Sequence, residues 1–327
     1  LESAGGRFIV TRDLPAPQPL NLLIQDFWRF LNLRGVLGTG YDLAIFGHPR
    51  NAWLAWLLKR SARVKKLIYD DWDYFPGLET TGYMRAMMES RERCCVQQAD
   101  ATMSVSSLLA DLRRRQGARE VLTVPNGVDL ALFSTARKKI PHPPTLAYMG
   151  SLAPSWGVDL SVRALPALKK RIPNVQLVIA GAGPEEAALK DLAAQLDVGR
   201  EVRFLGQVQP SALPGILAGA DVGLALSLPD SQFRQYASPL KLIEYMAAGL
   251  PVIATRVGQT ALAMQEAKAG ILIDQSVDEF VNAAEQLLTD ARLGEACSRA
   301  AIAYVARFDW SIVLQHAYQC ILDVLAD

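Results

Sequence analysis

The sequence is poor in the residue types that bind metals or form disulfides, and it has no excess of charge of either sign. Among 327 residues only four are cysteine and three are histidine, and no CxxC pair or metal-ligand spacing links them. A formal net charge of +1 offers no overall attraction for nucleic acid. These shortages argue against a disulfide scaffold, a zinc site and a nucleic-acid-binding protein. A reducing, cytoplasmic environment fits them best. Cys94 and Cys95, adjacent in a helical pattern, are interpreted as small apolar fillers.

Long hydrophobic runs are also lacking. No run reaches the about 18 apolar residues that a membrane-spanning helix needs, and no signal peptide is recognisable. The chain starts at Leu1 and enters directly on the apolar stretch 5–10. We therefore expect an upstream segment that supplies the first strand and helix of the first domain.

What is present is a hydrophobic half and a charged fifth of the residues, in a chain whose length suits two domains. Short apolar runs predict strands at 42–46, 66–69, 101–105, 121–124, 145–150, 175–180, 202–206, 222–226, 251–255 and 270–273. Helices are predicted near 20–33, 50–62, 83–98, 159–170, 210–218, 239–248 and 311–325, with another beginning at Pro184. Regular alternation of strands and helices predicts parallel sheets covered on both faces.

A charged, proline-rich segment at 137–144 is interpreted as a linker. It divides the chain into a domain at 1–136, a domain at 137–305 and a terminal helix within 306–327. Two Rossmann-like domains joined there would leave a cleft facing the carboxyl ends of both sheets, where such folds bind ligands. The terminal helix is apolar on one face, which favours packing on its own domain.

The stretch 238–249 carries the clearest functional pattern. Ser238 is a good helix N-cap, Pro239 suits the next position, and Gly249 supplies a left-handed stop. Backbone N–H groups at the start of this helix form an anion site, to which Lys241 adds a positive charge. Glu244, three residues on, lies on the same helical face and can accept hydroxyl hydrogens. A nucleotide diphosphate sugar requires this combination.

The alternative is a capped helix with an ordinary surface pair of Lys241 and Glu244. A lysine in the first turn opposes the helix dipole, however, so its position favours an anionic partner.

The run 238–255 resembles the donor-site signature of family 4 of the retaining GT-B glycosyltransferases (glycosyl transferases group 1), in the subset with the pattern SPxKxxEYMA. Further segments agree with that family: Val124–Asp129, Tyr148–Leu152, Trp156–Asp159, Ile179–Pro184, Phe204–Val208 and Ala220–Val222. The resemblance covers roughly residues 99–275. It implies a GT-B fold, with an acceptor-binding first domain, a donor-binding second domain and a terminal helix that crosses back to the first.

The resemblance also implies roles for individual residues. Glu244 would hold the ribose and Lys241 the diphosphate, while the backbone at 206–208 would contact the base and the loop 235–238 would face the transferred sugar. The implied donor-binding set is Tyr236, Ala237, Ser238, Pro239, Leu240, Lys241, Glu244, Gly206, Gln207, Val208, Gly150 and Ser151.

The sequence departs from the family pattern at three positions. The first of two glutamates eight positions apart is replaced by Tyr236, and the basic residues after the first donor-domain strand are replaced by Ser151 and Trp156. More of the diphosphate charge then falls to Lys241, with Arg234 or Arg163 as helpers. These departures leave the identity of the donor sugar open.

The acceptor side is predicted in the loop 69–77, where carboxylates follow a strand of the first domain. Asp73 or Asp71 would orient or deprotonate the acceptor hydroxyl, and the alternative for each is a capping or turn role. His48, also at a strand end, is interpreted as a loop residue. No metal is expected, because Lys241 and the helix dipole would stabilise the departing diphosphate, which makes Lys241 a catalytic candidate too.

We therefore expect a metal-independent glycosyltransferase without a cofactor, in the synthesis of a cell-surface polysaccharide or glycoconjugate. It would move a sugar from a nucleotide diphosphate sugar, a UDP-sugar being favoured, to a glycan or lipid-linked acceptor with retention. The replaced glutamate and the aspartate-rich loop leave inversion as the alternative outcome. Apolar segments followed by basic ones, at 27–34 and 51–66, with the arginines at 113–115, suggest attachment to the inner face of an anionic membrane. Buried helices with solvated basic ends are the alternative there. A catalytically silent nucleotide-sugar-binding subunit and a sugar-nucleotide epimerase of the same architecture are the rival functions.

Overall fold

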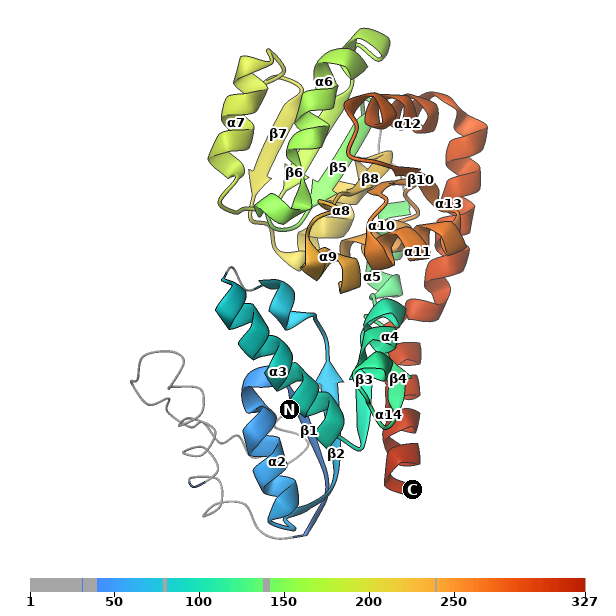
Figure 1. Ribbon diagram of the computed structural model, residues 1–327. Helices are drawn as coiled ribbons and strands as arrows, with labels where there is room; N and C mark the ends of the chain where they lie inside the picture. The colour runs from blue at the N-terminus through green and yellow to red at the C-terminus, as the bar shows by residue number, and fades with distance from the viewer. Residues whose placement is uncertain (1–30, 32–39, 79–80, 138–141, 239, 327) are drawn as a thin grey trace. The chain divides into compact units, whose positions relative to one another are not determined.

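The computed structural model describes residue 31 and residues 40–78, 81–137, 142–238 and 240–326 (Figure 1). The chain forms two compact units. The first contains the described residues up to Ser104, the segment Leu109–Thr123 and the end of the chain from Gln319. The second contains Val105–Leu108 and Val124–Tyr318.

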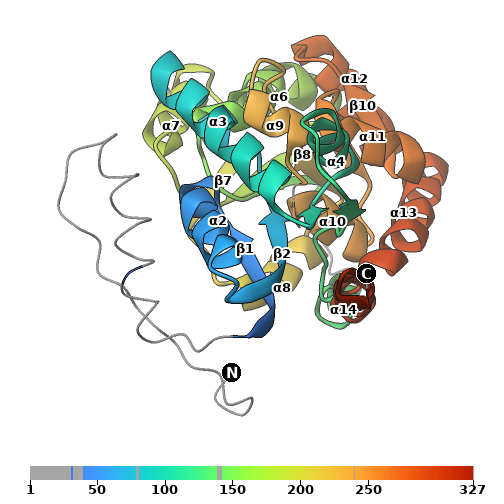
Figure 2. The ribbon, with the colours of Figure 1, turned by 60° about the horizontal axis from the view of Figure 1, so that its bottom comes forward.

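The first unit is built on a parallel sheet of four described strands, in the order β1-β2-β3-β4. The strands are β1 (Tyr41–Gly47), β2 (Val64–Asp71), β3 (Ala101–Ser104) and β4 (Val121–Thr123). Helices α2 (Ala52–Arg60) and α3 (Gly82–Gln98) lie side by side in both views (Figures 1 and 2), and two short 3-10 turns, Pro49–Asn51 and Phe75–Leu78, lie near them in the chain. The four predicted strands and these two helices are confirmed, whereas the predicted helix at 20–33 lies outside the described residues apart from residue 31.

The second unit is built on a parallel sheet of six described strands, in the order β10-β9-β8-β5-β6-β7. They are β5 (Thr145–Met149), β6 (Gln176–Ala180), β7 (Val202–Gly206), β8 (Val222–Ala225), β9 (Val252–Thr255) and β10 (Gly270–Ile273). All six predicted strands are confirmed. Counted within this unit, the order is 3-2-1-4-5-6 read from one edge, the doubly wound order of dinucleotide-binding folds, whose direction reverses between β5 and β8.

Alternation along the strands of the second sheet explains why helices cover both of its faces. Leu146 and Tyr148 of β5 face one core, whereas Ala147 and Met149 face the other. The first core also contains α6 (Asp159–Arg171), α7 (Glu186–Gln195) and α12 (Val277–Thr289). The second contains α8 (Leu213–Ala218), α10 (Leu240–Ala247), α11 (Gly258–Ala267) and α13 (Ala291–Val305). The helix predicted to begin at Pro184 begins instead at Glu186, two residues later.

The remaining elements are shorter or lie near the ends of the units. They are α4 (Ser107–Arg115), α5 (Leu130–Ser134), α9 (Gln232–Tyr236), α14 (Trp310–Ala326) and the 3-10 turns Thr135–Arg137, Pro154–Trp156, Pro210–Ala212 and Ala306–Phe308. The helix α14 belongs to the second unit up to Tyr318 and to the first from Gln319. Residues 138–141 of the predicted linker lie outside the described residues, and the domain boundaries predicted from the sequence stay predictions.

All four cysteines are free thiols, and Cys95 is fully buried in an apolar cluster of the first unit together with Val96. Cys94 packs against the same cluster. The interpretation of this pair as apolar fillers is therefore confirmed.

Candidate functional site

The point at which the strand order of the second sheet reverses brings the predicted donor residues together. Because all strands are parallel, the loops after β5 and β8 leave the same edge of the sheet, and ligands of doubly wound folds bind there. Gly150 and Ser151 follow β5, and α10 follows β8 by way of α9. Gly150 has a φ of 125°, and a Cβ atom on it would lie 3.2 Å from Nζ of Lys241. The helix with the SPxKxxEYMA pattern therefore begins beside the first donor-domain strand.

Lys241 is buried in this edge and lies against aromatic rings. The residue is only 7 % exposed, and Nζ donates a 3.0 Å hydrogen bond to the hydroxyl oxygen of Tyr148. Its Nζ also lies 4.2 Å from the ring centroid of Tyr148 and 3.3 Å from that of Trp156. Among the described residues no carboxylate lies within 4.0 Å of this ammonium group. Burial lowers the pKa of Lys241 well below its ordinary value, the nearby Arg234 lowers it further, and Glu244 acts in the opposite direction.

Glu244 lies one helical turn beyond Lys241 and is half-buried. Burial raises the pKa of its carboxyl group, and Lys241 partly offsets this effect. Within the described part of the chain its carboxylate makes no hydrogen bond and no ion pair. The alternative of an ordinary surface pair between Lys241 and Glu244 is therefore wrong. The carboxylate keeps its full capacity to accept hydrogen bonds.

Tyr148 connects Lys241 to the loop after β5. Its hydroxyl donates a 2.7 Å hydrogen bond to the carbonyl oxygen of Ser151 while it accepts from Lys241. Burial raises the pKa of Tyr148 above its ordinary value, so the phenol stays protonated. In the sequence, Tyr148 is recognisable only as part of the motif Tyr148–Leu152. Its role depends on a contact between residues 93 positions apart, which no local pattern reveals.

Trp156 and Arg234 also belong to this site. Arg234 lies on α9 with its Cζ 3.3 Å from the ring centroid of Trp156, and it donates to the hydroxyl of Ser155 at 3.3 and 3.2 Å. In the sequence, Trp156 stands out only because it replaces a lysine of the family pattern. Arg234 is one of two arginines that the sequence suggests as further cations for the diphosphate. The other helper, Arg163, is exposed and pairs with Asp159 at 3.0 Å.

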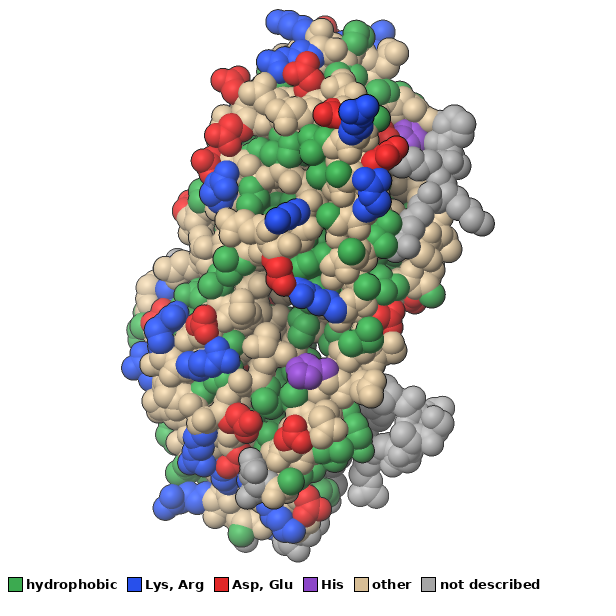
Figure 3. Space-filling model, turned by 90° about the vertical axis from the view of Figure 1, so that its right-hand side faces the viewer, with side chains coloured by type: hydrophobic (Ala, Val, Ile, Leu, Met, Phe, Trp, Pro, Cys, Tyr) green, Lys and Arg blue, Asp and Glu red, His purple; other side chains and the backbone are tan. Residues whose placement is uncertain are grey.

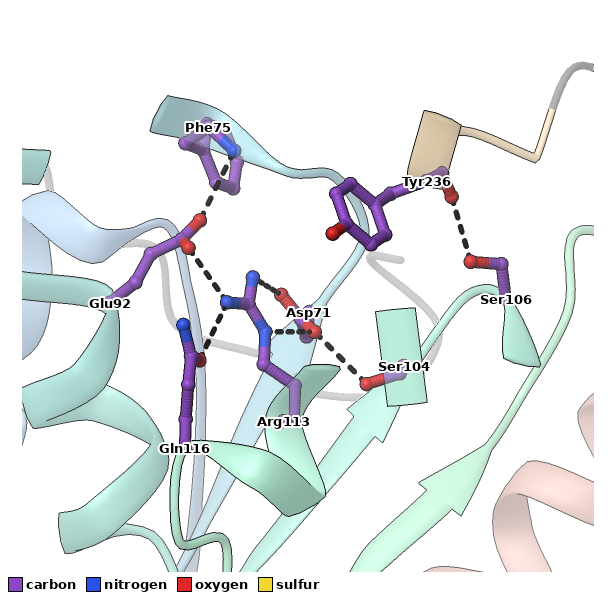
Figure 4. A network of polar contacts seen from close by, with 8 residues as sticks. All are labelled: Asp71, Phe75, Glu92, Ser104, Ser106, Arg113, Gln116 and Tyr236. Carbon is purple, nitrogen blue, oxygen red and sulfur yellow. Dashed lines mark hydrogen bonds and ion pairs between the residues drawn. The ribbon is translucent and has the colours of Figure 1, made fainter. Parts of the chain in front are cut away.

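Side chains from distant segments hold the loop that is predicted to face the transferred sugar, by hydrogen bonds to its backbone carbonyls. The carbonyl of Tyr236 accepts a 2.7 Å hydrogen bond from Ser106, as Figure 4 shows, and the carbonyl of Ser238 accepts a 2.8 Å bond from the amide of Asn126. Tyr236 ends the short helix α9, which the sequence did not predict. Ala237 is buried, whereas Leu240 is exposed. Pro239 lies outside the described residues.

Two glycine-containing segments meet beside Gly150. The amide of Gly150 donates to the carbonyl of Ala180 at 2.9 Å, and a Cβ atom on Gly181 would lie 1.8 Å from the carbonyl oxygen of Gly150. The segment Gly181–Gly183 thus supports the loop 150–152 by close approach of two backbones. Gly206 ends β7 at a φ of 65°, with Gln207 exposed and Val208 half-buried after it. These three residues, predicted to contact the base, lie at the carboxyl end of β7, on the same edge of the sheet as Gly150.

In the first unit, Asp71 is fully buried and both of its carboxylate oxygens accept hydrogen bonds. Arg113 donates to them from Nε and Nη2 at 2.8 Å each, and Ser104 donates at 2.9 Å (Figure 4). The same guanidinium contacts Glu92 at 2.7 Å, and Glu92 also accepts from the amide of Phe75 at 3.1 Å. Asp71 therefore has a structural environment at the end of β2, which leaves Asp73 as the better placed candidate in this loop.

Asp73 is half-buried just beyond β2. His48, at the end of β1, has a φ of 69°, accepts at Nδ1 from the amide of Arg50 at 3.1 Å, and packs against the ring of Phe75 at 4.3 Å. Burial lowers the pKa of His48, and Arg50 and Arg91 add to this effect. The interpretation of His48 as a loop residue fits its turn geometry. Among the described residues no group of three or more His, Cys, Asp or Glu side chains could hold a metal ion.

Several basic residues of the segments expected to contact a membrane pair with acids. Arg113 is buried in the network of Asp71, Lys59 pairs with Asp100, and Lys65 pairs with Asp42. The prediction that Arg113 belongs to a basic surface is therefore wrong. The segment 27–34 lies outside the described residues except for residue 31. On the face drawn in Figure 3, basic and acidic side chains are interspersed. No helix in the described ranges is long and apolar enough to cross a membrane.

Comparison with known proteins finds relatives of the second unit in particular. Residues 143–290 match the family model described as Glycosyl transferases group 1. The phosphatidyl-myo-inositol mannosyltransferase of Mycolicibacterium smegmatis is 30 % identical over 216 residues, covering 64 % of this chain and 54 % of that protein. The GDP-mannose-dependent alpha-(1-6)-phosphatidylinositol monomannoside mannosyltransferase of Mycobacterium tuberculosis is 32 % identical over 199 residues, covering 57 % of this chain and 52 % of that protein. The chain therefore spans about half the length of these curated relatives.

Solved structures show the fold. Sucrose-phosphate synthase of Thermosynechococcus elongatus is similar with a TM-score of 0.75 at 20 % identity, covering 97 % of this chain and 83 % of that one. HepE of Anabaena, in complex with UDP and glucose, gives a TM-score of 0.74 at 18 % identity, covering 94 % and 84 %. The chain accordingly has two parallel-sheet α/β Rossmann-like units, matching the fold of these solved structures.

Proposed function

We propose that this protein is a glycosyltransferase that moves a sugar from a nucleotide diphosphate sugar to a glycan or lipid-linked acceptor, with retention of configuration. The observation that carries the proposal is Lys241, a buried ammonium group without a carboxylate partner among the described residues, at the edge where the strand order reverses. A buried charge of this kind is costly unless an anion binds to it. A diphosphate at the start of α10 would supply that anion.

In the proposed reaction Lys241 stabilises the charge that develops on the departing nucleotide diphosphate. Glu244, whose carboxylate has its hydrogen-bonding capacity open, accepts from the ribose hydroxyls. The backbone at 206–208 contacts the base, and the loop 235–238 faces the sugar. Asp73 orients or deprotonates the acceptor hydroxyl, which attacks the anomeric carbon from the face that the diphosphate leaves, so that the configuration is retained as the bond to the diphosphate breaks. No step requires a metal ion or an organic cofactor.

The donor and acceptor are proposed by class. We favour a UDP-sugar, since UDP binds in HepE, but GDP-mannose is the donor named for one mannosyltransferase relative. Phosphatidylinositol derivatives in the names of two relatives support a lipid-linked acceptor, in keeping with a role at the inner face of the membrane. Synthesis of a cell-surface glycoconjugate is the process that fits both.

Binding of nucleotides tests the donor site. Lys241→Ala is expected to weaken UDP or GDP binding about tenfold or more, because a charge-assisted contact is lost. The matched control is Lys190→Ala, which removes a lysine of the same unit that lies 5.5 Å over Phe204 and pairs with Glu186. Glu244→Gln is expected to reduce the preference for UDP over 2′-deoxy-UDP. Titration calorimetry measures both, and unchanged affinity in Lys241→Ala would refute the donor-site assignment.

Turnover separates the enzyme from the silent binder and the epimerase. Transfer and hydrolysis assays with UDP-, GDP- and ADP-sugars are expected to release the nucleotide diphosphate. Thermal stabilisation by a nucleotide without turnover would favour the silent subunit, and conversion of the donor into its epimer would favour the epimerase. A product with inverted anomeric configuration would contradict retention.

A further inference from the structure

The indole ring of Trp156 lies between two cations. Nζ of Lys241 and Cζ of Arg234 are each 3.3 Å from the ring centroid. Two such groups cannot both occupy one face at this height, so they lie on opposite faces of the ring. The stack joins the turn Pro154–Trp156 to the helices α9 and α10, all within the second unit.

Further donors surround the same ring. The indole N–H of Trp156 is buried without a hydrogen-bond partner among the described residues. Arg234 directs Nε and Nη2 toward the single hydroxyl of Ser155 at 3.3 and 3.2 Å, so two of its donors share one neutral acceptor. Lys241 has only the Tyr148 hydroxyl as a hydrogen-bond acceptor within the described part of the chain. The stack thus brings two positive charges and an unsatisfied N–H together at one place.

This arrangement places two like charges close to each other. Arg234 repels the ammonium group of Lys241, and burial removes much of the solvent that would screen the two charges. Cations are brought so close at sites that bind an anion, because the anion converts the repulsion into attraction.

We propose that Arg234 is the second diphosphate-binding cation of this chain, and that Trp156 keeps Arg234 and Lys241 apart until a nucleoside diphosphate enters. This inference rests on the proposed function and identifies the residue that compensates for the basic side chains replaced at Ser151 and Trp156. The guanidinium group binds one phosphate group through its paired N–H donors, and Lys241 acts as a point charge on the diphosphate. Trp156 therefore separates Arg234 from Lys241 and stands at the position where the family pattern has a lysine.

Arg163 provides the matched control. It is an exposed arginine of the same unit, and its guanidinium is already paired with Asp159 on its own helix. It also follows the loop that contains Trp156. Replacing it removes the same charge without disturbing the stack.

The experiment compares nucleoside diphosphates with the matching nucleosides. UDP, uridine, GDP and guanosine are titrated against the wild type, Arg234→Ala, Arg234→Lys, Arg163→Ala and Lys241→Ala. For Arg234→Ala we expect about a tenfold loss of affinity for the diphosphate that the wild type binds, and no change for its nucleoside. Arg234→Lys should recover part of the loss, and Arg163→Ala should behave as the wild type.

The outcomes separate this inference from the proposed function. Unchanged diphosphate affinity in Arg234→Ala, with affinity lost in Lys241→Ala, overturns the role of Arg234 and leaves the donor site intact. An equal loss for diphosphate and nucleoside in Arg234→Ala also overturns it, since the contact is then not to phosphate. A wild type that binds no nucleoside diphosphate refutes the proposed function itself.

Fluorescence tests the role of Trp156 directly. Diphosphate binding draws the two cations away from the indole of Trp156, so the emission of the wild type should change on adding the nucleotide. Trp156→Phe, which keeps an aromatic ring, should still bind but lose that change. An identical change in Trp156→Phe would overturn the role of Trp156, and circular dichroism would confirm that the variant is folded.

Discussion

At the scale of single residues, the buried network of Arg113, Asp71 and Glu92 in the first unit balances one positive charge against two carboxyl groups. In the first unit, Arg113 faces the two carboxylates of Asp71 and Glu92, and all three side chains are fully buried. Burial raises the pKa of Asp71 more than the two guanidinium contacts of its bidentate pair lower it. Glu92 is the group that gains a proton, because burial raises its pKa to about 7 despite the opposing effect of Arg113.

This balance predicts a pH dependence of stability. The pKa of Glu92 in the folded protein lies above its ordinary 4.5, so the folded state binds the proton of this carboxyl group more tightly than the unfolded state does. The stability that this proton contributes is complete below pH 4.5 and is lost as pH rises through about 7. Glu92→Gln, which mimics the protonated form, should remove about 1 to 3 kcal/mol of that dependence in urea unfolding between pH 4.5 and 7.5. Glu89→Gln, on the same helix, is the control. Parallel pH profiles for Glu92→Gln and the wild type would contradict the assignment.

At the scale of elements, the proposed donor site depends on how closely the loops after β5 and β6 approach each other. The Cβ atom of an alanine at position 181 would overlap the carbonyl oxygen of Gly150, so the loop carrying Gly150 and Ser151 would have to move. Lys241 and Tyr148 contact the same loop. The glycines after β6 are therefore structural supports of the anion site.

Gly181→Ala should accordingly lower the unfolding free energy by about 1 to 3 kcal/mol and weaken nucleotide binding together with it. Gly199→Ala is the matched control, because Gly199 is exposed, has no atom within 4 Å of the place that an alanine methyl would occupy and does not need a positive φ. Thermal unfolding with and without UDP measures both effects. Equal melting temperatures for the two variants would show that the close approach is not required.

At the scale of the whole molecule, the chain consists of two compact units, and the residues proposed to bind the donor all belong to the second. A nucleotide that binds there stabilises the folded form of that unit by mass action, by about 2.7 kcal/mol at a hundredfold excess over Kd. Amide exchange should therefore slow in peptides covering 148–158 and 234–248 when UDP or GDP is added. Protection confined to β1, β2 and α3 would contradict the placement of the donor.

Much of the site could be predicted from the sequence because its signal is local. The run 238–249 carries a capping residue, a lysine in the first turn and a glycine stop within twelve consecutive residues, and α10 forms there with Gly249 at a φ of 75°. The two parallel sheets could also be predicted, since each strand is an apolar run between helical stretches. The roles of Tyr148, Trp156 and Arg234 could not, because their contacts join a strand, a turn and two helices.

The sequence by itself thus determined the strands, the doubly wound class and the positions of Lys241 and Glu244, since hydrophobic periodicity and helix capping act over a few residues. Only the tertiary structure decided how the charges are used. It buried the candidate carboxylate of Asp71 in an ion pair with an arginine 42 positions later, and it placed Trp156 between Arg234 and Lys241. Charge interactions depend on distance and burial in space, and the order of residues along the chain specifies neither.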